Sequence, residues 1–73
     1  SLQDTYGKLN TYFAILANAD SQTKSYQDAL GAINQLCSEH HVELLKENAA
    51  IDEQIAKHDE LIEKIEKIIK VNK

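Results

Sequence analysis

The sequence predicts an all-α protein, and within that class a long helix that forms a parallel coiled coil. Apolar residues recur at alternating spacings of three and four, which places them in a narrow seam along one side of a helix. Proline is absent, and the only glycines are Gly7 and Gly31. Three tyrosines and one phenylalanine are too few for a typical compact globular core. Residues 1–73 are therefore expected to form a single coiled-coil oligomerisation segment.

The seam residues are expected to form the oligomer interface. Strict heptad spacing is broken at 23–26 and at 37–41, and shifts of this kind locally over- or underwind a supercoil. The expected interface consists of Leu2, Tyr6, Leu9, Phe13, Leu16, Tyr26, Leu30, Ile33, Cys37, His41, Leu44, Asn48, Ile51, Ile55, His58, Ile62, Ile65 and Ile69.

One segment, 18–25, offers a break in the helix. It contains no aliphatic residue larger than alanine, and Ser25 with Asp28 imitates an N-terminal capping box. A break there would divide the chain into an N-terminal helical part at 1–18 and a main coiled-coil helix at 26–71. The seam spacing continues through the segment, and neither proline nor glycine forces a turn. Continuity is therefore the favoured interpretation.

The C-terminal half carries the strongest pattern, between Leu44 and Ile69. Isoleucine at both kinds of core position favours trimers, whereas Asn48 at one of them favours a parallel dimer. A dimer is the favoured prediction, with a trimer as the alternative. The pattern Glu39–Glu43–Glu47 opposes a continuous helix, because like charges four residues apart repel. Favourable Glu-to-Lys pairs are expected at Glu53–Lys57, Glu60–Lys64, Glu63–Lys67 and Glu66–Lys70.

No catalytic, cofactor or metal site is expected. Cys37 and His41 are four residues apart and could supply half of a zinc site, with His40 beside them, but no second ligand pair exists. A small buried thiol explains Cys37 better. Phosphate-binding loops and hydrolase motifs are absent from the sequence, and a helical rod has no pocket for a small-molecule substrate.

Composition also limits the partners. A net charge of −4 and a basic set of lysines without arginine argue against nucleic-acid binding. Membrane contact is not expected, although the amphipathic stretch 64–71 has lysines that suit an anionic lipid surface. A lone cysteine favours an intracellular, and specifically a cytoplasmic, setting.

The predicted function is structural: to dimerise or oligomerise a larger parent protein. The alternative is a segment of a heteromeric scaffold that pairs with another protein's helix. Residues 47–55 and 57–61 resemble, across a gap, the coiled-coil stalk of tumour-susceptibility-protein subunits of the endosomal sorting complex. Their residues are those that any exposed heptad carries, so the resemblance assigns no family. It implies only the class of that alternative: trafficking or sorting, tethering, or cytoskeletal complexes.

Overall fold

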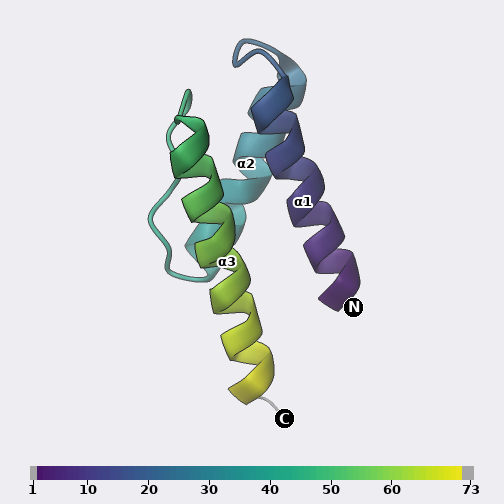
Figure 1. Ribbon diagram of the computed structural model, residues 1–73, viewed down its shortest axis with the longest axis vertical. Coiled ribbons are helices and arrows are strands. Elements are labelled where there is room, and N and C mark those ends of the chain that lie inside the picture. The colour runs from purple at the N-terminus through teal and green to yellow at the C-terminus, as the bar shows by residue number, and fades with distance from the viewer. Residues whose placement is uncertain (1, 72–73) are drawn as a thin grey trace.

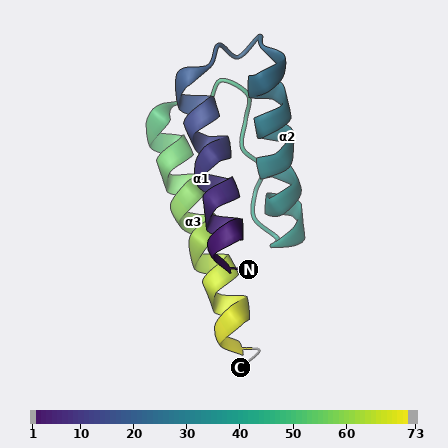
Figure 2. The same cartoon turned by 90° about the vertical axis from the view of Figure 1, so that its right-hand side faces the viewer.

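The chain forms an all-helical bundle. A computed structural model describes the backbone of residues 2–71 and the side chains of residues 3–68. It contains α1 (Leu2–Asn18), α2 (Lys24–Glu39) and α3 (Ile51–Val71), and no strand occurs within 2–71. Helix α1 packs against both other helices and runs antiparallel to them (Figures 1 and 2).

The expected single long coiled coil is wrong. A continuous helix of this length would extend for about 110 Å, whereas the longest dimension of the folded chain is 41 Å. The chain reverses direction three times, and the first two reversals fall where the seam spacing departs from a strict heptad. These departures therefore mark helix ends and not shifts in a supercoil. The third reversal lies at Asn48, which has a φ of 64°.

The first reversal occupies residues 19–23, so continuity through 18–25 is corrected. The Asp20 carboxylate accepts a hydrogen bond from the backbone N–H of Gln22 at 2.8 Å, which is the geometry of an Asx turn. Thr23 then caps α2, because its hydroxyl oxygen accepts from the backbone N–H of Tyr26 at 3.2 Å. The capping residue is thus Thr23, and the box expected at Ser25 does not form the cap.

The second reversal begins at the end of α2. His41 has a φ of 57°, in the left-handed region that residues other than glycine adopt infrequently. The backbone N–H of Val42 donates to the carbonyl of Cys37 at 2.8 Å, and that of His41 donates to Ser38 at 3.3 Å. This pair of bonds is a Schellman motif, with His41 in the position that glycine usually holds. The main helix expected at 26–71 is therefore interrupted here.

The connection, residues 40–50, is an irregular segment that returns along α2. The side-chain amide of Asn34 donates to the carbonyl of Leu45 at 3.0 Å and accepts from its N–H at 2.8 Å. Further along, the Tyr26 hydroxyl accepts from the backbone N–H of Asn48 at 3.0 Å. These side chains replace the backbone bonds that a helix would have supplied. The connection runs back to the end of the bundle at which α3 starts (Figure 1).

Helix α3 begins without a side-chain cap. Its first backbone bond runs from Gln54 to the carbonyl of Ala50 at 3.0 Å, and alanine has no side-chain acceptor for the free N–H groups. Asp52 and Glu53 in the first turn suit the positive end of the helix dipole. The Gln54 side chain is buried, and its amide donates to the carbonyl of Ala49 at 3.1 Å.

The core is formed within one chain. Leu9, Ile33, Cys37 and Leu61 are completely buried, and they come from all three helices. The full set of buried apolar residues is Leu9, Phe13, Leu16, Tyr26, Ala29, Leu30, Ile33, Cys37, Val42, Leu45, Leu61 and Ile65. The seam of the sequence is thus largely the surface along which the chain packs on itself.

Candidate protein-binding surface

The residues predicted to form an oligomer interface divide by exposure. In the folded chain, eight of them lie in its own core, namely Leu9, Phe13, Leu16, Tyr26, Leu30, Ile33, Cys37 and Ile65. Tyr6, His58 and Ile62 are half-buried, whereas His41, Leu44, Asn48, Ile51 and Ile55 are exposed. Leu2 and Ile69 lie outside the described side chains. Contact of any of them with a second chain stays a prediction.

Four core residues were not among those that the seam spacing predicted. Leu61 flanks the seam and turns out to be completely buried, and Ala29 directly precedes Leu30. Val42 and Leu45 are buried from the connection, where no helical spacing applies. The signal for Leu61 was its place on the widened apolar face. Periodicity gave none for Val42 and Leu45, because their burial depends on the hydrogen bonds that hold an irregular segment.

Large apolar side chains remain exposed at four positions. The exposed fractions are 54% for Leu44, 51% for Ile51, 56% for Ile55 and 47% for Ile68. Ile51 and Ile55 are four residues apart on α3 and therefore lie on the same face of that helix. Single exposed apolar residues are ordinary, and a contiguous pair beside a groove is a candidate contact surface.

A groove between α1 and α3 adjoins this pair. It has a volume of about 270 Å³ and is lined by Phe13, Ala17, Ile51, Gln54, Ile55 and His58. His58 closes one end: its Nε2 lies 2.6 Å from the Asn10 Oδ1, and its ring packs edge-on against Phe13 at 5.1 Å. Because most of the lining is apolar, the groove suits an apolar side chain.

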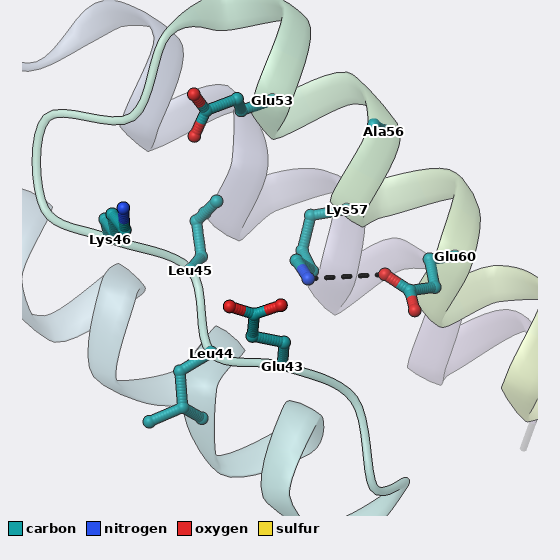
Figure 3. Close-up of a pocket in the computed structure, with 8 residues that line it drawn as sticks. All are labelled: Glu43, Leu44, Leu45, Lys46, Glu53, Ala56, Lys57 and Glu60. Carbon is teal, nitrogen blue, oxygen red and sulfur yellow. Dashed lines mark hydrogen bonds and ion pairs between the residues drawn. The ribbon is translucent and has the colours of Figure 1, made fainter.

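A second recess lies between the connection and α3 (Figure 3). It is lined by Glu43, Leu44, Leu45, Lys46, Glu53, Ala56, Lys57 and Glu60. The Lys57 Nζ lies 3.2 Å from the Glu60 carboxylate. Lys57 therefore pairs with Glu60, whereas the sequence predicted a pair with Glu53. Three glutamates and two lysines line an open, charged recess. The recess is open and does not enclose a substrate.

The thiol and imidazole that the sequence set four residues apart do not share a helix face. Helix α2 ends at Glu39, so His41 follows it on an exposed turn, whereas Cys37 is completely buried. Burial raises the pKa of the Cys37 thiol, which keeps it protonated and unreactive near neutral pH. Among the described side chains, no group of three His, Cys, Asp or Glu residues is placed to hold a metal ion.

Two buried polar atoms lack a hydrogen-bond partner within the described part of the chain: the Tyr6 hydroxyl and the His40 Nδ1. Desolvation raises the pKa of Tyr6, and the nearby Glu66 carboxylate raises it further.

Across residues 2–71, none of the helices combines the length and the apolar character that crossing a bilayer requires.

The fold and surface define a class, a small all-α bundle with an apolar groove between two helices. No protein-family model, curated protein or solved structure matches the chain.

Proposed function

We propose that the chain is a structural protein–protein interaction module, which joins the protein that carries it to a further protein chain. The observation that carries the proposal is the exposure of Ile51 and Ile55 at the α1–α3 groove. Covering such side chains removes apolar area from water, which is worth about 25 cal/mol per Å². The buried thiol and the open, charged recess support a binding role over a catalytic one.

Two kinds of partner fit this function. A second copy would make the chain the oligomerisation module that its sequence favours, as a dimer or a trimer. A helix of another protein would make it part of a heteromeric scaffold, such as a sorting, tethering or cytoskeletal complex. A standard interface buries about 800 Å² per partner. An interface of that size would cover about a sixth of the 4999 Å² that the chain exposes.

Sedimentation equilibrium tests the proposal. The chain is compared with a variant in which Leu44, Ile51, Ile55 and Ile68 are all changed to serine. A control variant replaces four exposed polar residues, Gln22, Gln35, Glu63 and Lys67, with serine. A dimer or trimer that the first variant loses and the control keeps supports self-association.

If the chain sediments as a monomer, the partner is sought by crosslinking from within the parent protein. A photo-crosslinker at position 55 should then join one partner protein that a crosslinker at position 22 does not reach. A chain that stays monomeric, and that gives the same crosslinks from both positions, would overturn the proposed function.

A further inference from the structure

The isoleucines of the groove belong to a longer apolar stripe on α3. Ile62 follows Ile55 by seven residues, or two helical turns, and is half-buried on the same side of the helix. The stripe from Ile51 to Ile62 spans about 17 Å at 1.5 Å per residue. An amphipathic helix presents apolar residues over this length at spacings of three and four.

Carboxylates border this stripe on its outer side. Asp52, Asp59 and Glu66 are exposed and seven residues apart, so they lie along one line of α3. The side chain of Asp59 is 77% exposed, with the His58 Nδ1 at 3.6 Å. No ion pair to a lysine forms at any of these three carboxylates among the described side chains.

Among the described side chains, no lysine lines the groove. Lys57 lines the recess on the other side of α3, and Lys64 follows it by two turns on the same line. Lys8 lines a recess between α1 and α2. Beside the groove, α1 presents Asn10 and Ala17, which carry no charge. The groove thus has an apolar floor, one acidic border and one neutral border.

We infer that the α1–α3 groove binds a basic amphipathic helix of another protein, with apolar residues against Ile51 and Ile55 and lysine or arginine beside Asp59 and Glu66. This inference rests on the proposed function and names the partner class. Charge complementarity carries the choice of partner, since opposite charges at the border of an interface direct association and set specificity.

A second copy fits this groove less well. In a symmetric antiparallel pair centred on Asp59, Asp59 would face its own equivalent, and Asp52 would face Glu66. A parallel pair in register would place each carboxylate beside its own copy. Like charges at such positions oppose association. The border therefore selects against self-pairing and in favour of a cationic partner.

The test uses the whole chain and two synthetic peptides of about 18 residues, or five helical turns. Both peptides have the same leucine stripe; lysine flanks the stripe in one and glutamate in the other. Fluorescence anisotropy measures the Kd, and backbone amide chemical shifts of the chain locate the peptide. Two double variants are compared: I51S with I55S in the groove, and L44S with I68S elsewhere as the control.

The lysine peptide is expected to bind with shifts confined to the groove, and about tenfold or more tightly than the glutamate peptide. The groove variant should weaken binding of the lysine peptide about tenfold or more, while the control variant keeps the original Kd. The double variant D59N/E66Q should weaken binding of the lysine peptide several-fold, because it removes two carboxylates from the border. The control double variant E39Q/E43Q should not weaken it. Equal binding of both peptides, or equal loss in groove and control variants, overturns the inference.

The failure of this inference is separable from the failure of the proposed function. A dimer of the chain that dissociates in the I51S/I55S variant would place a second copy in the groove. That result overturns the basic-helix partner and supports the interaction module. The module itself fails only on the monomer and crosslinking result described for its own test.

Discussion

The side-chain amide of Asn34 hydrogen-bonds both backbone groups of Leu45, and so pairs α2 with the connection as a neighbouring strand would. Leu45 is buried, which means that its backbone N–H and carbonyl depend on this one side chain. The position of the connection, and through it the start of α3, rests on this contact.

Replacing Asn34 with alanine should therefore cost more than an ordinary surface change. Two backbone groups lose their partner in a part-buried site, and we expect a loss of about 2 kcal/mol in the free energy of unfolding. Urea denaturation followed by circular dichroism measures it. The control is Asn18→Ala, where the lost bond is an exposed one to Ala14. Equal effects of the two changes would contradict the role given to Asn34.

The capping of α2 gives a matched pair of variants. Thr23→Ala removes the hydroxyl that accepts the N–H of Tyr26, and we expect a loss of about 1 kcal/mol in unfolding free energy. Ser25→Ala alters the residue that the sequence favoured as a cap, inside the first turn, and should change stability by less than about 0.5 kcal/mol. Thermal or urea unfolding measures the unfolding free energy of both variants and shows which residue caps α2. A larger effect at Ser25 would move the start of the helix.

The left-handed conformation of His41 predicts a stabilising glycine. His41→Gly removes the Cβ that disfavours a φ of 57°, and we expect a gain of about 0.5–1 kcal/mol in unfolding free energy. Glu39→Gly, two residues earlier in the last turn of α2, should instead cost about 0.5–1 kcal/mol. Opposite signs for neighbouring glycine substitutions would confirm the Schellman turn. A loss at both positions would indicate that α2 continues past Glu39.

The buried thiol predicts how stability depends on alkaline pH. Burial raises the pKa of Cys37 above its ordinary value of 9.0, so the folded chain holds this proton more tightly than the unfolded chain. That contribution is complete below the unfolded pKa and is lost as pH rises through the folded pKa.

Unfolding free energy should thus fall above about pH 9, by up to about 1.4 kcal/mol per pH unit for one proton. Urea titrations between about pH 8 and 10 should give a steeper fall for the wild type than for Cys37→Ala. Tyr6, whose pKa is also raised, adds a decline at higher pH in both proteins. Parallel curves for the two proteins would exclude Cys37 as the group responsible.

Much of the helical content follows from the sequence, because spacings of three and four place Leu9, Phe13 and Leu16 on one face. The same spacing fits a helix that packs on a second chain and one that packs on its own chain. What decides between them is whether the chain reverses, and here the reversals use Thr23, His41 and Asn48 in place of glycine or proline. The bonds at Thr23 and His41 are local, whereas the turn at Asn48 is held by the distant Tyr26 hydroxyl. Periodicity reveals neither kind of bond.

One local signal opposed the continuous helix. Glu39, Glu43 and Glu47 would repel one another at four-residue spacing on a single helix. In the structure only Glu39 belongs to a helix, and the Glu47 carboxylate accepts a hydrogen bond from Gln27 at 3.1 Å. The groove was beyond prediction for a related reason: it joins Ala17 of α1 to Ile51 of α3, residues that only the folded topology brings together.

The packing of α1 against both other helices also sets the order in which the fold opens. Its amides are covered by neighbours on two sides, whereas the last turns of α3 extend past the start of α1 (Figure 2). Native-state hydrogen exchange should therefore be slowest in the middle of α1, near Leu9 and Phe13, and fastest towards the end of α3. The exposed stripe from Ile51 to Ile62 lies in the earlier turns of α3, so the end of the helix can open while the stripe keeps its place beside α1.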